Sequence, residues 1–316
     1  MSLIVIKDKT HAIERPWPIA RQEAIGTMRK VVDTNFLKSD ELREFLSDPA
    51  NVAVVPDFVM METLAGGDPT SICQQFQILA EHPKQVIFLK STHAIGGLRA
   101  RRRSRGLQKR LIEKDQTANF KRFYEKLELA KGGDAAAKRQ LAGKCDAAVA
   151  ELGAIRKAQE TYAKNLAEHA KKYTDAELAI LTKGKPIPKE LLAKITGEIR
   201  ALANAMFAAH PYFKRQPPLR KLSNAFLFRY AVAGYVVALR CLKEGGANGA
   251  SSKNIGNQII DTMIAAYATY FDGFLSADKR AQQIYDTTCD LLKVYHHDMQ
   301  LFEEGQSAAQ QATYGG

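Results

Sequence analysis

The sequence predicts an α/β fold, a three-layer α/β/α arrangement with a mostly parallel central sheet, plus a long all-α insertion that resembles a helical hairpin or coiled coil. Three observations indicate this. Short apolar runs alternate with helical segments in the first part of the chain. A long stretch of helical periodicity follows, and an apolar helix–strand unit lies near its end. The predicted organisation is an N-terminal extension (1–30), a discontinuous core (31–91 and 251–300), a basic helical insertion (92–250) and a disordered tail (301–316).

The first core elements follow from apolar runs and capping residues. Val31–Leu37 is expected to be a short strand that runs into a turn, and Val52–Val55 is typical of a strand buried on both faces. Helices are expected from Glu41 after the cap Ser39-Asp40, from Pro56-Asp57 to Gly66-Gly67, and from Asp68-Pro69 to Ala80. A third strand is expected at residues 86–89.

The middle of the chain is predicted to be helical and basic. Long helices are expected over residues 108–130 and 134–173, with further helices over 188–209 and 219–243. The second of these carries an impure heptad seam, which favours packing within a hairpin over the alternative of dimerisation. Its positions are Leu141, Cys145, Ala148, Leu152, Ile155, Gln159, Tyr162, Leu166, His169 and Tyr173.

The last core elements contain two acids. Residues 244–256, with four glycines, are expected to be a flexible linker. A buried helix is expected from about Gln258 to Phe271, with Asp261 at its start, followed by a short strand at Phe274-Leu275 and then Asp278. If that strand returns antiparallel to the helix, both carboxylates end at one level, which makes them a candidate metal site. A final strand is expected at residues 291–295.

Charge is divided unevenly along the chain, whose net charge is +12. Residues 91–250 contain 32 Lys and Arg residues against 14 Asp and Glu residues, and the remainder contains 14 against 20. Either a polyanion binder with an acidic centre or a solvated helical insertion would show this division. An arginine run favours nucleic-acid contact over a solvated helix face, because guanidinium groups pair with phosphates. Its members are Arg99, Arg101, Arg102, Arg103 and Arg105.

Composition limits the remaining function classes. The longest apolar runs fall short of the ~18 residues that a membrane helix needs, so no membrane span is expected. The N-terminus lacks the features of a signal peptide. Four scattered cysteines without a Cys-x-x-Cys pair indicate reduced thiols and argue against a zinc ribbon, and together these features predict a cytoplasmic protein.

Four acids are predicted to meet at one edge of the sheet. Asp33 ends the first strand, Glu62 lies in the first two turns of the helix after the second strand, and Asp261 and Asp278 flank the last helix–strand unit. Four converging carboxylates would repel one another unless divalent cations neutralise them, and hard oxygen ligands select Mg²⁺ or Mn²⁺. Such a site can activate water for phosphodiester cleavage. Asp57 and Asp272 are instead expected to be helix caps or turn residues, and His296-His297-Asp298 is not expected to bind metal.

Four motifs together resemble the PIN-domain nucleases: Val-Val-Asp-Thr-Asn, Val-Pro-Asp-Phe-Val-Met-Met-Glu, Asn-Gln-Ile-Ile-Asp and Phe-Leu-Ser-Ala-Asp-Lys. The resemblance implies an α/β/α fold and a metal-dependent nuclease, more often acting on RNA than on DNA, in which Asp33, Glu62, Asp261 and Asp278 form the acidic quartet. It also implies that Asn35 and Ser276 support the quartet by hydrogen bonding. A toxin-like member would have an antitoxin as partner.

The chain departs from that family in two respects. Its helical insertion is long, and Gln282 and Gln283 stand where some members have a fifth acid. The alternative hypothesis is a non-catalytic scaffold whose helical insertion binds a partner protein or nucleic acid, with a homodimer also possible.

Overall fold

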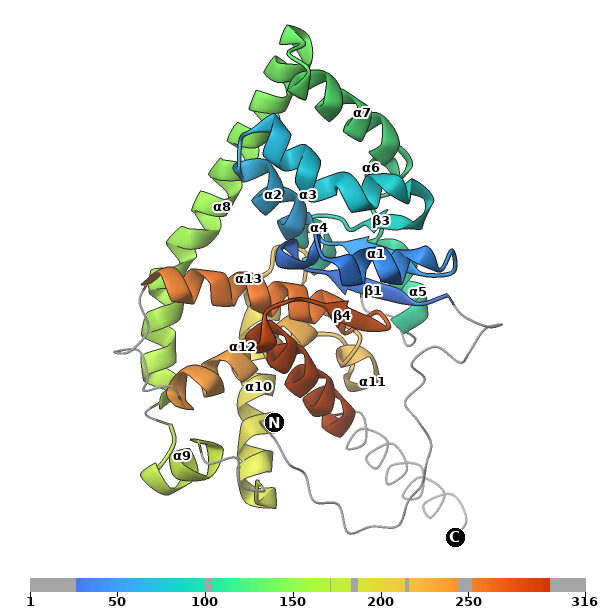
Figure 1. Cartoon of the computed structure of the whole chain (residues 1–316). Helices are drawn as coiled ribbons and strands as arrows, with labels where there is room; N and C mark the ends of the chain where they lie inside the picture. Colours follow the sequence, from blue (N-terminus) through green and yellow to red (C-terminus); the bar gives the residue numbers. More distant parts are fainter. Residues whose placement is uncertain are drawn as a thin grey trace.

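The fold is built around a parallel four-stranded sheet with the strand order β3-β2-β1-β4 (Figure 1). The computed structural model describes residues 27–99, 104–170, 172–182, 187–213, 216–243 and 252–295. The strands are β1 (Arg29–Val32), β2 (Val52–Val55), β3 (Val86–Phe88) and β4 (Gly273–Leu275). The prediction of an α/β protein with a parallel sheet is therefore confirmed.

The register brings the carboxyl ends of all four strands to one edge of the sheet. Val31 is aligned with Val54 of β2 and with Phe274 of β4, and Val54 is aligned with Ile87 of β3. Ala53, Val54 and Val55 are fully buried, as the continuous apolar run predicts. The residues that follow the strands therefore meet at one edge.

The helices of the first part of the chain are capped as their sequences indicate. Ser39 caps α1 through the amide of Leu42, Asp68 caps α3 through that of Ser71, and Ser91 caps α4 through that of Ala94. The elements are η1 (Thr34–Phe36), α1 (Asp40–Ser47), α2 (Asp57–Ala65), α3 (Pro69–Glu81), η2 (Pro83–Gln85) and α4 (Thr92–Gly96).

The prediction of one long helix over residues 108–130 is wrong. Three short helices replace it, α5 (Ser104–Leu111), α6 (Lys114–Ala118) and α7 (Phe120–Lys131). The chain breaks at Ile112, which forms an antiparallel bridge with Leu89 beyond the end of β3. The amide of Lys90 donates to the carbonyl of Leu111, and that of Glu113 donates to the carbonyl of Phe88, both at 2.8 Å. These non-local hydrogen bonds outweigh the local helix propensity.

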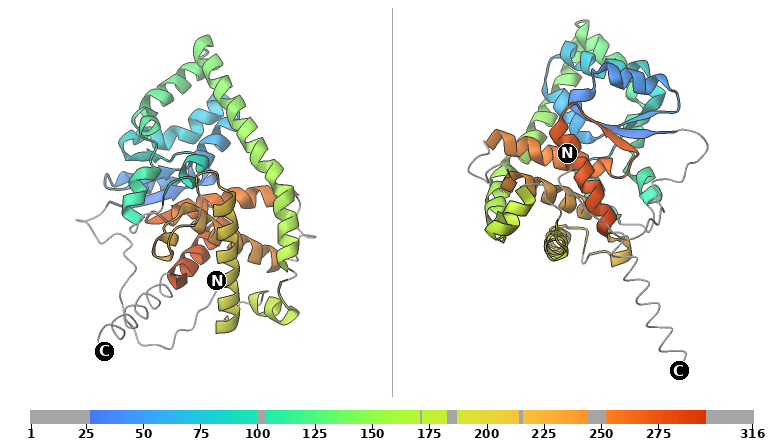
Figure 2. Two further views of the ribbon diagram at one scale, coloured as in Figure 1. Left: turned by 180° about the vertical axis from the view of Figure 1, so that it is seen from behind. Right: turned by 60° about the horizontal axis from the view of Figure 1, so that its bottom comes forward.

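Residues 134–243 form the remaining helices before the last core unit. They are α8 (Ala135–Ala170), α9 (Asp175–Thr182), α10 (Lys189–Ala209), α11 (Leu219–Leu222) and α12 (Phe226–Lys243). Helix α8 packs against α7, α2 and α13, while α12 packs against α10 and α13 (Figures 1 and 2). In the seam, Leu141, Cys145, Ala148, Leu152 and Tyr173 are buried. The side chains at seam positions 155–169 lie outside the described part of α8.

The last core unit differs from the prediction at both ends. Helix α13 (Ser252–Ala268) begins before Gln258, so residues 252–256 are helical rather than linker, and Asp261 lies within the helix instead of at its start. The expected strand at residues 291–295 is wrong, because residues 279–295 form a helix. Ala281, Ile284, Thr288, Leu291 and Tyr295 are buried at helical spacing along it.

Several predictions fall outside the described residues. They include most of the N-terminal extension with Trp17, residues 244–251 of the linker, the tail and His296-His297-Asp298. Across the ranges that the structure does describe, every helix is too short or too polar to cross a membrane.

Candidate metal-binding acidic site

Asp33 is placed by the end of β1 at the carboxyl edge of the sheet. Its amide donates to the carbonyl of Leu275 at 2.9 Å, which continues the pairing of β1 with β4. Its Oδ1 accepts a hydrogen bond from the amide of Thr34 at 2.7 Å, so the carboxylate caps η1. Only 7% of Asp33 is exposed. A buried carboxylate in this position is costly unless hydrogen bonds or a cation compensate it.

Ser276 and Asn35 connect the loop after β4 to Asp33. The hydroxyl of Ser276 donates to Oδ2 of Asp33 at 2.6 Å and accepts from the amide of Asp278 at 3.1 Å. Oδ1 of Asn35 accepts from the amide of Ala277 at 2.9 Å, and its Nδ2 lies 3.4 Å from Oγ of Ser276. These two polar side chains therefore hold Asp33 beside the segment that carries Asp278.

Glu62 reaches the same group from α2. The hydroxyl of Thr34 donates a hydrogen bond to its Oε2. Glu62 lies in the second turn of α2, as expected, and Thr34 directly follows Asp33. Thr34 therefore orients Glu62 toward the end of β1.

Asp261 completes the group from α13. Burial above all, together with the negative charges of Asp33, Asp278 and Glu62, raises its pKa to about 7, while Arg280 opposes this rise. For Asp33, burial also raises the pKa, Ser276 and Thr34 oppose that rise through hydrogen bonds, and Asp278 adds to it. The four predicted acids therefore act on one another electrostatically although they come from four different segments.

The donor chemistry of this group suits a hard divalent cation. It offers carboxylate oxygens together with the hydroxyls of Thr34 and Ser276, and no sulfur or imidazole. Within the described ranges, however, no group of three or more His, Cys, Asp or Glu side chains is already arranged to hold a metal ion.

Thr34 and Arg280 were missed in the sequence analysis. Thr34 stands between the two recognised polar residues Asp33 and Asn35, and a hydroxyl at that turn was the available signal. Arg280 lies two residues after Asp278, whose Oδ1 accepts from the amide of Arg280 at 2.6 Å. A cation so close in sequence to an acid of the site was the signal for it.

Asp57 and Asp272 make structural hydrogen bonds, although Asp57 is the first residue of α2 and does not cap it, because the N-cap is Pro56. Oδ2 of Asp57 accepts from the amide of Thr92 at 2.8 Å, and its Oδ1 accepts from that of Phe58 at 3.0 Å, so it joins α2 to α4. Oδ2 of Asp272 accepts from the amide of Arg29 at 2.8 Å.

The arginine run is only partly described. Arg99 is exposed, and its carbonyl accepts from Nη1 of Arg110 at 2.9 Å. Arg101, Arg102 and Arg103 lie outside the described residues, as does the side chain of Arg105 in α5.

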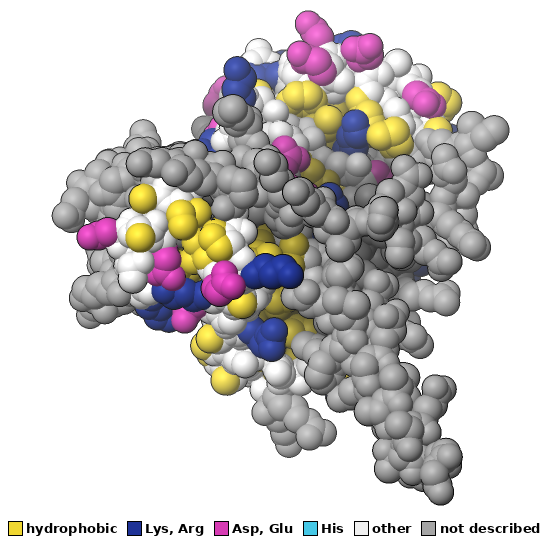
Figure 3. Space-filling view, turned by 90° about the horizontal axis from the view of Figure 1, so that it is seen from below, with side chains coloured by type: hydrophobic (Ala, Val, Ile, Leu, Met, Phe, Trp, Pro, Cys, Tyr) yellow, Lys and Arg dark blue, Asp and Glu magenta, His cyan; other side chains and the backbone are white. Residues whose placement is uncertain are grey.

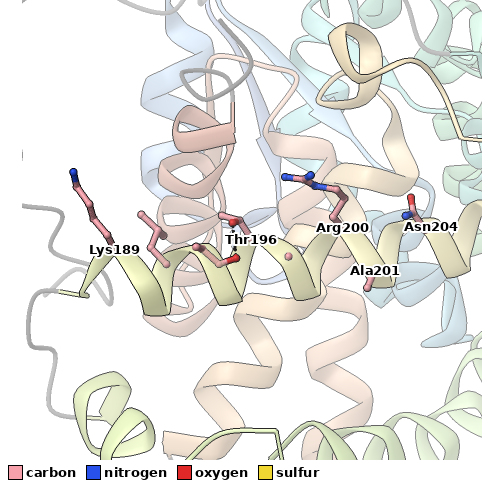
Figure 4. Close-up of a pocket in the computed structure, with 8 residues that line it drawn as sticks. Lys189, Thr196, Arg200, Ala201 and Asn204 are labelled. Atoms are coloured by element: carbon pink, nitrogen blue, oxygen red, sulfur yellow. Dashed lines mark hydrogen bonds between the residues drawn. The ribbon is translucent and has the colours of Figure 1, made fainter. Parts of the chain in front are cut away.

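A hollow lies along α10, away from the four acids. It has a volume of about 790 Å³ and is lined by the polar residues Lys189, Thr196, Arg200 and Asn204 together with Leu192, Ala193, Gly197 and Ala201 (Figure 4). Its described lining residues all belong to α10 and include none of the four acids. Viewed from below, this end of the molecule shows hydrophobic side chains next to Lys and Arg side chains (Figure 3).

Compared with protein-family models, curated proteins and solved structures, the chain gives no match.

Proposed function

We propose that this chain is a metal-dependent nuclease with a PIN-like core, and that Asp33, Glu62, Asp261 and Asp278 form its active site. The observation that carries the proposal is the mutual interaction of these four acids at the carboxyl edge of the sheet. The hydrogen bonds of Ser276 and Asn35 support it, because outer partners of this kind orient ligating carboxylates.

In this proposal, Asp33, Asp261 and Asp278 hold Mg²⁺ or Mn²⁺. The bound ion would supply an activated water and stabilise the charge that develops on the leaving oxygen. Ser276 fixes the orientation of Asp33, and Thr34 fixes that of Glu62, which completes the cluster or orients the attacking water. Cation binding would draw the four carboxylates together, because it replaces their mutual repulsion by attraction to one centre.

The proposal also covers the arrangement of layers in the core and the role of the helices between β3 and β4. We propose a three-layer α/β/α core, with the helices between β3 and β4 as an insertion that positions a polyanionic substrate. The net charge of the insertion supports this use. RNA is favoured over DNA only because the family that the motifs resemble acts mostly on RNA.

The experiment is incubation of single-stranded RNA and single-stranded DNA with the protein in Mn²⁺, Mg²⁺ or EDTA. Wild type should cleave only with a divalent ion, and Asp33→Asn and Asp278→Asn should each lose that activity. Asp146→Asn, an exposed acid on α8, is the control and should cleave like wild type. Equal cleavage by wild type and both site variants would exclude this site. Absence of cleavage and of divalent-ion binding, with nucleic-acid binding retained, would favour the non-catalytic scaffold.

A further inference from the structure

Three aromatic rings gather at the end of β3, outside the acidic site. His93 belongs to α4, while His210 and Tyr212 follow α10. The ring of His93 is stacked on that of His210 at 6.5 Å, and the ring of Tyr212 lies 6.1 Å from His93 and 5.6 Å from His210. Two segments far apart in the sequence therefore build one aromatic cluster, here called the ring platform (His93, His210 and Tyr212).

Two glycines give the ring platform its place. A Cβ atom at Gly97 would come within 2.9 Å of Cδ2 of Tyr212, and one at Gly96 would come within 3.2 Å of Nε2 of His210. The amide of Tyr212 also donates to Nδ1 of His210 at 3.3 Å. The absence of side chains at both glycines thus lets the rings lie directly against the end of α4.

The platform faces solvent. Tyr212 is 68% exposed, more than any other large hydrophobic side chain in the described part of the chain, and His93 is exposed as well. Single exposed apolar side chains need no explanation, but the exposed rings of His93 and Tyr212, tilted by 53° to each other, each present a face on which another ring can stack.

A basic residue follows α4 in the chain, and two acids line a hollow beside His93. Arg99 is exposed two residues after Gly97, and Arg110 donates to its carbonyl. His93 also borders a hollow of about 320 Å³, and two acids, Asp57 and Glu151, line that hollow. Arginines attract phosphates, whereas carboxylates repel phosphates and accept hydrogen bonds from base amino groups. These groups suit a nucleotide, whose phosphate would pair with Arg99 and whose base amino groups would donate to the acids of the hollow.

His93 and Asp33 both follow strands of the parallel sheet. His93 lies in α4, after β3, and Asp33 directly follows β1, with β2 between the two strands. Two strand spacings put β3 and β1 about 10 Å apart. A single strand of nucleic acid that passes over the carboxyl ends of these strands would meet both residues.

We propose that His93, His210 and Tyr212 form a base-stacking platform for single-stranded nucleic acid. The inference rests on the proposed nuclease function for the class of substrate, and it adds the requirement that the bases be unpaired. A duplex hides the faces of its bases and cannot stack on the platform.

The test is the dissociation constant for a short fluorescein-labelled single-stranded RNA, measured by fluorescence anisotropy in EDTA so that no cleavage intervenes. Tyr212→Ala should weaken binding roughly 5- to 100-fold, the effect of losing one stacked base. Tyr212→Trp should retain the affinity, and its indole fluorescence should be quenched by the bound RNA. His93→Ala should weaken binding in the same direction.

Matched controls separate stacking from general damage. Leu129→Ala removes an exposed apolar side chain from α7 and should bind like wild type. Gly97→Ala should weaken binding because the new methyl group displaces the Tyr212 ring, whereas Gly143→Ala, which meets no atom within 4 Å, should not. Circular dichroism of all variants checks that they are folded.

Wild-type affinity in both Tyr212→Ala and His93→Ala would overturn the proposal, as would an equal loss of affinity for single-stranded and duplex RNA. Its failure is distinguishable from that of the nuclease. If the wild-type protein shows no metal-dependent cleavage but binds RNA in a way that depends on Tyr212, only the proposed active site is contradicted. Metal-dependent cleavage with binding indifferent to Tyr212 and His93 counts against the platform alone.

Discussion

The hydroxyl of Ser276 donates a hydrogen bond of 2.6 Å to Oδ2 of Asp33, although the two residues are 243 positions apart. The bond closes the contact between the ends of β1 and β4, the two strands that pair in parallel at this place. It also stabilises the charged form of Asp33 against the effect of burial. One hydroxyl therefore serves both the fold and the candidate site.

Replacing Ser276 by alanine should weaken metal binding. The variant loses the hydrogen bond that holds Asp33 charged and oriented, and loss of such an outer partner typically costs about 10- to 100-fold in metal affinity. Titration calorimetry with Mn²⁺ measures the change. Ser47→Ala, which removes a hydroxyl bonded only to a helix carbonyl, is the control and should leave the affinity unchanged. Unchanged affinity in Ser276→Ala would show that Ser276 does not support the site.

The metal-free protein should lose stability as the pH rises from 5 to 8. Asp261 has a pKa of about 7 in the fold against 3.8 as its ordinary value, so the folded state holds a proton that the unfolded chain has already released. The stabilisation is complete below the unfolded pKa and is lost as the pH rises through the folded pKa. Linkage allows up to about 3 kcal/mol between these two pH values.

Urea unfolding in EDTA at the two pH values measures this loss, and Asp261→Asn isolates it. The asparagine cannot titrate, so the variant should lose less stability than wild type. Asp57, whose pKa is raised to about 6 by burial, contributes a loss of the same sign in both proteins. An identical pH dependence of wild type and Asp261→Asn would contradict the raised pKa.

Arg229→Lys should destabilise the protein by roughly 2–4 kcal/mol, because a lysine cannot reproduce the planar fork of the arginine. Arg229 is 2% exposed, and its guanidinium donates to the carbonyl of Ser223 at 2.8 Å, to Oγ1 of Thr269 at 3.0 Å and to Oδ1 of Asn224 at 3.1 Å. It also lies 3.9 Å from the ring centroid of Tyr270. Thermal unfolding compares it with the exposed control Arg122→Lys, and equal midpoints would refute the prediction.

Gln85→Glu should lower the free energy of unfolding by about 1–3 kcal/mol, although glutamate has nearly the same shape as glutamine. Nε2 of Gln85 lies 3.0 Å from the carbonyl of Leu46, 2.8 Å from that of Asp48 and 3.0 Å from that of Asn51. Its two N–H groups are shared among these three acceptors and so fix the connection between α1 and β2. A carboxylate there would face three carbonyl oxygens without a proton to donate. Chemical denaturation against the exposed control Gln77→Glu tests this, and equal stability of the two variants would speak against it.

Local patterns were sufficient to predict the strands of the sheet and the caps of the early helices. Ala53, Val54 and Val55 are buried in the sheet interior, and Asp68 caps α3, because both features depend on adjacent residues. The expectation that the four acids meet rested on one further rule, that parallel strands end at a common edge, and the structure shows that common edge. The role of Thr34 could not be predicted from the sequence, because its hydrogen bond to Glu62 depends on the packing of α2 against η1.

The secondary-structure predictions failed where contacts between residues distant in the sequence determine the conformation. Leu-Leu-Lys-Val-Tyr at residues 291–295 contains strand-forming residues, but its burial follows the helical spacing that begins at Ala281. Ile112 lies in a segment of helical periodicity, yet it leaves the helix to bridge Leu89. The ring platform was equally hidden, because His93 and Tyr212 are brought together only by the packing of the chain after α10 against α4.

Calorimetric titration of Mn²⁺ into the full chain tests the central claim most directly, with wild type compared with Asp33→Asn, Asp261→Asn and the exposed control Asp146→Asn. The four-carboxylate site predicts saturable binding to wild type and to the control, and strongly weakened binding to both site variants. Absence of binding to wild type, or equal binding to all four proteins, would contradict it.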